Sequence, residues 1–319
     1  MKPDGFVADL HLKPEVLDGL AATLAEGNPW AAAVRPDLDR VVLLGMGSSA
    51  YAGGVAAARM RARGLVVTSE LASSRLLPDW GPGTLVVATS ASGGSVETLD
   101  ALSRLPEGVH TVALTNTPYS TITQRCDAFV YLAAAPEVGG VACRSYQHTL
   151  AMLMALECHL TGTDTAALSN TVASAATATA HLIETESDWR PTLSDLLLGP
   201  DGTHLAAPAH RFCSAQQGAL MLREGPRLPA VGCETGDWSH VDVYLTKTTD
   251  YRLLVFAGSA WEAQLAEWTI ERGSTVVGVG GSVPGARYEL RYPGDSDDDV
   301  RLLTEVLVPE LVAARAWSF

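Results

Sequence analysis

The sequence has little positive charge and no long apolar run. Its 319 residues include 22 Lys and Arg against 36 Asp and Glu, which gives a formal net charge of −14. Binding to nucleic acid requires clustered basic residues that displace counterions, so this charge balance argues against it. No apolar run approaches the ~18 residues that a membrane-spanning helix needs. We therefore expect no nucleic-acid partner and no membrane association.

Cysteine is also scarce, and its spacing is uninformative. The five cysteines show no CxxC pair; they are Cys126, Cys143, Cys158, Cys213 and Cys233. This pattern argues against a zinc site and against a disulfide framework. His204 and His210 have no Cys or carboxylate partner at ligand spacing. Because the N-terminus is polar and carries no targeting signal, the sequence predicts a cytoplasmic protein with reduced thiols, no metal and no cofactor.

What the sequence does contain is an alternation of short apolar strands and helical segments. With 47% hydrophobic and 18% charged residues, the chain is long enough for two domains of ordinary size. In the first half, strands are expected at 40–44, 65–68, 85–89, 109–114 and 129–132, with helices at 51–63, 73–77, 96–105 and 120–125. This order predicts right-handed crossovers and a parallel sheet with helices on both faces.

The second half repeats the pattern more loosely. Strands are expected at 204–207, 228–231, 253–256, 275–279 and 288–292, and helices at 217–224, 261–272 and 298–317. Between the halves, one long helix is expected around 150–160 and a second at 166–189, and the domain boundary is placed in the Pro- and Gly-rich segment 190–203. The predicted domains are an N-terminal helical segment (1–39), a first α/β domain (40–189) and a second (190–319). The predicted fold class is α/β, with two doubly wound parallel sheets in tandem.

One turn concentrates small hydroxyl groups where a strand gives way to a helix. Ser90, Ser92 and Ser95 surround Gly93 and Gly94 in this turn. The first amides of a helix lack internal partners, and the helix dipole is positive there, so a phosphate is stabilised at such a place. Serine hydroxyls donate to phosphate oxygens, and glycine lets the backbone approach a ligand. The alternative is a Ser- and Gly-rich turn with an ordinary helix cap.

Two more polar turns follow other strands of the first sheet. Gly47, Ser48 and Ser49 lie between the strand 40–44 and its helix, and Asn116 follows the strand 109–114. In open parallel sheets, ligands bind at the carboxyl ends of the strands, where all these residues fall. Their convergence favours a phosphate site over a plain turn.

With these residues in place, the chain resembles the SIS (sugar isomerase) family of phosphosugar-binding domains. It looks most like the isomerase half of glucosamine-6-phosphate synthase and its stand-alone relatives. The similarity runs from about His11 to Pro309. The motifs that carry it are 45–49 (GMGSS), 90–95 (SASGGS), 114–116 (LTN), 137–144 (EVGGVACR, with one extra glycine), 218–224 (GALMLRE) and 236–240 (GDWSH).

The resemblance implies two flavodoxin-like SIS subdomains and assigns roles to particular residues. Glu224 would move a proton between C1 and C2 through a cis-enediol, and His240, donated by the other subunit of a homodimer, would assist ring opening. Ser48 would bind a sugar hydroxyl. The remaining implied contacts to phosphate or substrate are Gly47, Ser49, Ser90, Ser92, Ser95, Asn116, Gly140 and Ala142.

The chain also departs from the family pattern. Ala91 replaces a Gln, Met221 a Lys, and Gln217 a Glu. The sequence ends at Trp317-Ser318-Phe319 without the synthase's C-terminal Lys tail, and it shows no N-terminal glutaminase domain, so glutamine-dependent amination is not expected.

Three functions therefore stay open. The favoured one is a phosphosugar aldose–ketose isomerase or amino-sugar-phosphate deaminase. The second is a non-catalytic phosphosugar-binding protein, and the third is a pathway-specific amino-sugar or nucleoside-phosphate enzyme on the same fold. Taken without the resemblance, Glu224 is equally explained as a solvent-facing carboxylate at a helix end, and His240 as a histidine in a surface turn.

Overall fold

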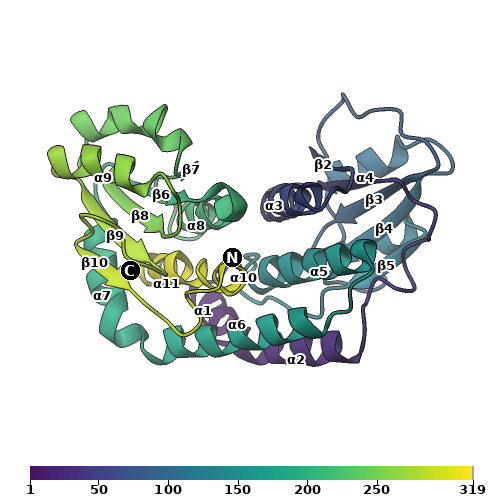
Figure 1. Ribbon diagram of the computed structural model, residues 1–319. Coiled ribbons are helices and arrows are strands. Elements are labelled where there is room, and N and C mark those ends of the chain that lie inside the picture. The colour runs from purple at the N-terminus through teal and green to yellow at the C-terminus, as the bar shows by residue number, and fades with distance from the viewer. Residues whose placement is uncertain (318–319) are drawn as a thin grey trace. The chain divides into compact units, whose positions relative to one another are not determined.

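The computed structural model describes residues 1–317, which form two compact units (Figure 1). The first-sheet unit comprises Val16–Pro136 and Arg144–Val172. The second-sheet unit comprises Met1–Glu15, Glu137–Cys143 and the chain from Ala173 onward. The units are thus interleaved along the chain, whereas the domains expected from the sequence are contiguous stretches.

The first sheet is fully parallel, with strand order β2-β1-β3-β4-β5. Its strands are β1 (Arg40–Gly45), β2 (Val67–Leu71), β3 (Thr84–Thr89), β4 (His110–Thr115) and β5 (Ala128–Tyr131). All six residues of β3 are buried, as expected for a central strand covered on both faces. The helical elements of this unit are α3 (Ser48–Ala62), α4 (Val96–Ser103), η1 (Ile122–Gln124) and α5 (Arg144–Thr161).

The second sheet is also parallel, with order β10-β9-β8-β6-β7. Its strands are β6 (Thr203–Ala207), β7 (Ala230–Glu234), β8 (Arg252–Phe256), β9 (Thr275–Val279) and β10 (Tyr288–Leu290). Read from β7, this order is the same as that of the first sheet, so β6 corresponds to β1 and β8 to β3. The order is that of flavodoxin-like folds, which confirms the predicted tandem α/β architecture.

Helices cover both faces of the second sheet because β8 is apolar on both sides. Leu254 and Phe256 pack in a core with residues of α7, α8 and α11, and Leu253 and Val255 pack in another core beside Trp238. The helical elements are α1 (Pro3–His11), η2 (Ala209–Arg211), α7 (Glu186–Leu197), α8 (Phe212–Glu224), η3 (Asp237–Ser239), η4 (Asp242–Lys247), α9 (Glu262–Glu271), α10 (Asp298–Thr304) and α11 (Leu307–Trp317). Two helices have residues in both units, α2 (Lys13–Glu26) and α6 (Ala166–Glu184).

Three local predictions were wrong. The helix expected at 166–189 is two helices, α6 and α7, and α7 continues through Pro191 because Trp189, Leu193 and Leu197 bury its apolar face. The expected helix 298–317 is also two helices, since Pro309 has no N–H to donate to the Glu305 carbonyl. No helix forms at 73–77. The N-terminal segment 1–39, expected to be helical, contains α1 and α2.

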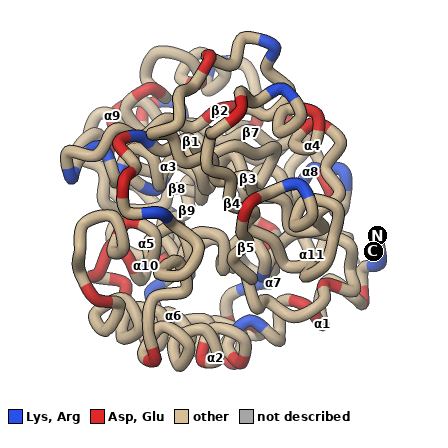
Figure 2. Tube along the Cα trace, turned by 90° about the vertical axis from the view of Figure 1, so that its right-hand side faces the viewer, with Lys and Arg blue, Asp and Glu red and all other residues tan. Residues whose placement is uncertain are grey.

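The charged residues are dispersed along the described chain. In the view of Figure 2, Lys and Arg positions lie among Asp and Glu positions and do not gather into one basic patch. Within residues 1–317, none of the helices has both the length and the apolar character needed to cross a bilayer.

Candidate functional site

The turns after β1, β3 and β4, which we call the first rim, lie at the carboxyl edge of the first sheet. The turns after β3 and β4 are joined directly, because the Ala91 carbonyl accepts the Asn116 N–H at 3.0 Å and the hydroxyls of Thr115 and Thr117 at 3.2 and 3.1 Å. Since β1 and β3 are neighbouring parallel strands, the β1 turn ends at the same edge. The sheet therefore brings the predicted serine-rich turns together.

Two serine hydroxyls of the β3 turn are held only loosely by the chain itself. Ser90 Oγ accepts from the Ser95 N–H and Ser92 Oγ from the Gly94 N–H, each at 3.4 Å. These distances exceed the ordinary 2.7–3.2 Å range for N–H···O bonds. Ser95 is held more firmly, because its Oγ donates to Glu97 Oε2 at 3.1 Å and accepts from the Thr98 hydroxyl at 3.0 Å. The first amides of α4, on Val96 and Glu97, have no carbonyl to bind within the helix. An incoming anion thus finds hydroxyls and amides that it can engage at little cost.

Two glycines give the β3 turn its shape. Gly93 has φ +68°, and a Cβ there would collide with the Ser120 side chain. The buried Ser120 hydroxyl finds no hydrogen-bond partner in the described part of the chain. By contrast, a Cβ on Gly94 would be 3.9 Å from its nearest neighbour, Ser92 Oγ. Gly93 therefore fixes the turn, and Gly94 leaves it open.

The β1 turn has a similar open side. Gly47, with φ +51°, is the N-cap of α3, and a Cβ there would meet no atom within 4 Å. Ser48 and Ser49 are the first two residues of α3 and are partly exposed. Their position at a helix start is the one that the sequence predicted.

Both polar atoms of the Asn116 side-chain amide form hydrogen bonds. Its Nδ2 donates to the Ala135 carbonyl at 2.8 Å, and its Oδ1 accepts the Ala134 N–H at 2.9 Å. Ala133 and Ala135 have φ of +55° and +54°, an unfavourable region for alanine that this clamp stabilises. The geometry favours a supporting role for Asn116 over direct contact with a ligand.

Glu224 lies in the second-sheet unit, at the C-terminal end of α8, and is half-buried. Burial raises the pKa of its carboxyl above the usual value of 4.5, and the negative charge of Glu137 raises it further. A raised pKa makes this carboxylate a stronger base than an exposed glutamate. Glu137 stands in the motif 137–144, but nothing in the sequence marked its charge as important.

Gln217 and Met221 are placed on the same face of α8 as Glu224, at spacings of seven and three residues. Both side chains are fully buried. Gln217 Nε2 donates to the Ala142 carbonyl at 2.9 Å, while its Oε1 finds no partner among the described residues. The segment Glu137–Cys143, which we call the crossing loop, closes on itself because Glu137 Oε1 accepts the Cys143 N–H at 2.8 Å. This unit thus brings Glu224, Glu137 and Ala142 to one region.

His240 is exposed and lies directly after η3. Its backbone N–H donates to the Asp237 carbonyl at 2.8 Å. The main neighbours of η3 are β7, η4 and α9. His240 is therefore available at the surface of the unit that carries it.

Comparison with known protein families identifies the part of the chain that carries the first rim. Residues 37–157, which include all of the first sheet and the crossing loop, match the model of the SIS domain. Residues 37–157 therefore form a SIS domain. The serine turns of the first rim lie inside the matched SIS domain, whereas Glu224 and His240 lie beyond it.

Relatives and solved structures agree with this SIS assignment. The chain is 26% identical over 322 residues to a glutamine–fructose-6-phosphate aminotransferase (isomerizing) from Pyrobaculum aerophilum, covering 97% of this chain and 52% of that protein. It thus spans about half the length of that relative. A C-terminal domain of glucosamine-fructose-6-phosphate aminotransferase from Francisella tularensis has TM-score 0.81 at 16% identity, covering 98% of this chain and 96% of that one. A glucosamine-6-phosphate deaminase from Thermotoga maritima has TM-score 0.75 at 17% identity, covering 98% and 94%.

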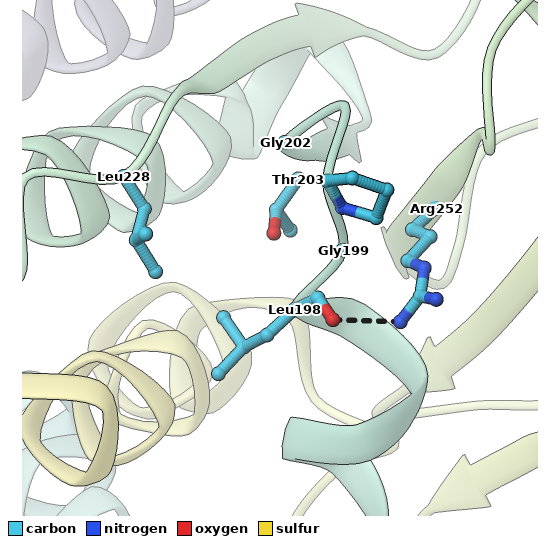
Figure 3. A pocket seen from close by; sticks show the side chains of 7 residues that line it. Leu198, Gly199, Gly202, Thr203, Leu228 and Arg252 are labelled. Carbon is cyan, nitrogen blue, oxygen red and sulfur yellow. Dashed lines mark hydrogen bonds between the residues drawn. The ribbon is translucent and has the colours of Figure 1, made fainter. Parts of the chain in front are cut away.

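A separate pocket of ≈ 350 Å³ lies at the amino edge of the second sheet, where its strands begin (Figure 3). Thr203 and Arg252, the first residues of β6 and β8, help to line it. Arg252 is already engaged, because its guanidinium donates to the carbonyls of Asp195 and Leu198 at 2.9 and 2.7 Å and to the Asp250 carboxylate at 2.8 Å. This amino-end pocket offers no free charge to a phosphate. Across residues 1–317, His, Cys, Asp and Glu side chains form no group of three or more that could hold a metal.

Proposed function

We propose that this SIS-domain protein is a phosphosugar enzyme, either an aldose–ketose isomerase or an amino-sugar-phosphate deaminase. The observation that carries the proposal is the pair of loosely held hydroxyls, on Ser90 and Ser92, beside the helix-start amides at the first rim. The names of its relatives, which include an isomerizing aminotransferase and a deaminase of glucosamine 6-phosphate, agree in chemistry with a phosphorylated sugar.

In this proposal the first rim binds the phosphate. Ser90, Ser92 and Ser95 would donate hydroxyl hydrogens, and Ser49 would do so from the β1 turn beside Gly47. Binding at the phosphate end supplies energy that orients the reacting carbons, which are several bonds away. Ser48 would contact a sugar hydroxyl, and Gly140 and Ala142 would present backbone groups to the sugar.

Glu224 would act as the base that moves a proton between C1 and C2 through a cis-enediol. Its raised pKa, caused first by burial and then by Glu137, suits a group that must both take and return a proton. His240 would reach the sugar ring from the other subunit of a homodimer and assist ring opening. Light scattering with size exclusion tests that assembly, and a strictly monomeric active protein would exclude this role for His240.

A non-catalytic phosphosugar-binding protein is the second candidate. Met221 places an apolar side chain on the α8 face beside Glu224, where the family resemblance led us to expect a Lys. An enzyme for a pathway-specific amino sugar or nucleoside phosphate would also be consistent with an apolar residue at this position. Under all these functions we propose a cytoplasmic location, consistent with five free thiols.

Proton exchange in D₂O distinguishes these functions. The protein is mixed with aldose, ketose and amino-sugar phosphates, and deuterium at C1 or C2 and released ammonia are measured. Deuterium incorporation should fall by about 10²- to 10⁴-fold in Glu224→Gln, the range for general acid–base catalysis. Glu267→Gln, an exposed change on α9, is the matched control. Ammonia release identifies a deaminase, and thermal stabilisation without exchange identifies a binding protein.

A further inference from the structure

The crossing loop belongs to the second-sheet unit although the residues on both sides of it belong to the first-sheet unit. Groups of the second-sheet unit bind it at several points. One contact is the bond from Gln217 to the Ala142 carbonyl described above. Others come from α1 and the residue before it.

Asp9 on α1 binds the loop with both carboxylate oxygens. The side chain is 2% exposed, and it accepts the Val138 N–H at 3.1 Å and the Gly139 N–H at 2.7 Å. Hydrogen bonds to an ionised acceptor are stronger than neutral ones, and a buried pair of this kind fixes both position and orientation. The Lys2 N–H adds a bond to the Gly139 carbonyl at 3.0 Å.

The backbones of α1 and the loop approach so closely that only glycine fits. A Cβ on Gly139 would lie 2.6 Å from Phe6 N and Cα, and a Cβ on Gly5 would lie 3.0 Å from Gly139 N and Cα. The φ of Gly139 is outside the left-handed region, so glycine is required at this position for lack of space and not for its backbone conformation. The extra glycine of the motif 137–144 thus has a physical reason, which is contact with α1.

The N-terminal segment that carries Asp9 is itself fixed to its unit. Lys13 forms an ion pair with Glu310 of α11, and both side chains are fully buried. Breaking such a pair is strongly destabilising because it leaves one buried charge without a partner. The buried Lys13–Glu310 pair therefore fixes the N-terminal segment that carries Asp9 to α11.

We propose that Asp9 is a positioning residue for the reaction: it holds the crossing loop so that Glu137 and Ala142 keep their places beside Glu224 and Gln217. This inference rests on the proposed function. Loss of the hold would displace Glu137 from Glu224 within the second-sheet unit, so proton transfer would suffer, while the serine turns that would bind phosphate belong to the other unit and would not change. Displacements of about 1 Å far from the chemistry can reduce rates by roughly 10²-fold.

The test compares Asp9→Asn with Asp4→Asn, an exposed change on the same helix. The amide introduced by Asp9→Asn keeps one acceptor oxygen but turns an NH₂ toward the other loop N–H. We expect kcat for C1–C2 exchange to fall about 10- to 100-fold in Asp9→Asn, with the dissociation constant for the sugar phosphate within about twofold of wild type. Asp4→Asn should match wild type, and Asp9→Glu should recover part of the rate. A merely structural role would lower Tm without lowering kcat per folded molecule.

Hydrogen exchange of the Val138 and Gly139 amides gives a readout that does not depend on turnover. Both amides should exchange faster in Asp9→Asn and at wild-type rates in Asp4→Asn. Unchanged protection together with an unchanged kcat overturns the inference. If wild type shows no proton exchange with any sugar phosphate, the proposed function fails, and amide protection alone then decides whether Asp9 holds the loop. Gly139→Ala, which keeps the carboxylate but forces α1 away, serves if Asp9→Asn does not fold.

Discussion

The two sheets share one strand order, but their carboxyl edges have opposite chemistry. At the first rim, the hydroxyls of Ser90 and Ser92 in the turn after β3 accept hydrogen bonds only at 3.4 Å. At the second rim, formed by the turns after β6, β8 and β9, the equivalent turn after β8 is bound by a carboxylate of the chain itself. Glu262 Oε1 accepts the N–H groups of Gly258 and Ser259 at 2.5 and 2.7 Å.

The turn after β6 strengthens this contrast. Arg211, which is 1% exposed, pairs with the fully buried Glu305 and donates to the Ala257 carbonyl. Asp298 lies 3.4 Å from Arg211 Nε and 3.4 Å from His210 Nε2. The cations at this edge therefore already face carboxylates. Both sheets thus have strand ends and helix starts where an anion could bind. Only at the first rim do the local residues leave that position available.

The largest expected effect is on stability at the second rim. Replacing Arg211 by Met leaves Glu305 buried without its partner and should lower the unfolding free energy by about 3–5 kcal/mol, whereas Arg211→Met with Glu305→Leu should recover most of the loss. Burial raises the pKa of Glu305 from 4.5 to about 7. The folded chain thus holds that proton more tightly than the unfolded chain, and the group's contribution to stability falls as pH rises from about 4.5 to about 7. Urea unfolding at pH 5 and pH 8 should show the larger loss at pH 8.

The next effect is on binding at the first rim. Ser90→Ala removes a hydroxyl that would donate to phosphate, and should weaken hexose-phosphate affinity at least tenfold, since hydrogen bonds to charged groups contribute about 1.5–3 kcal/mol. Ser259→Ala, at the equivalent turn of the second rim, is the matched control and should leave the affinity unchanged. Calorimetric titration measures both. Equal weakening by the two changes would contradict the contrast between the rims.

A smaller effect is expected from Glu262→Gln. Loss of the carboxylate that accepts the Gly258 and Ser259 N–H groups of the turn before α9 should cost about 1 kcal/mol of stability, the usual net contribution of a hydrogen bond. The affinity for sugar phosphate should not change. If this variant bound a second phosphate per chain, Glu262 alone would be what keeps anions from the second rim. We do not expect this, because the carboxylates of Glu305 and Asp298 also lie at that rim.

The smallest effect is a displaced pH profile. Glu224 must be ionised to accept a proton, and its raised pKa places the acid limb of kcat/KM above the usual value for a glutamate. Glu137→Gln removes the charge that contributes to this shift, so the acid limb should move to lower pH. The Gln oxygen can still accept the Cys143 N–H, which preserves the loop. The control Glu267→Gln should leave the acid limb of kcat/KM unmoved. The same result for Glu137→Gln would show that Glu137 does not contribute to the pKa of Glu224.

Local patterns were the reliable part of the prediction. Alternating apolar runs gave both parallel sheets, because burial on two faces demands continuous apolar strands. The serine-rich turns were found at the first rim because strand ends and helix starts are short-range features. The helix expected to end at 189 instead gives way to α7, which runs to Leu197, because packing of Trp189 and Leu193 outweighs the local signal of Pro191.

The sequence by itself determined the α/β class, the repeated architecture and the hydroxyl-rich strand ends, since each depends on neighbours within a few positions. Tertiary structure decided which polar groups are already occupied and which stay open. Asp9 reaches an amide 130 positions away, and Lys13 pairs with a carboxylate 297 positions away. Such contacts depend on how the folded chain brings distant segments together and excludes water from them, and no periodicity in the sequence encodes that exclusion.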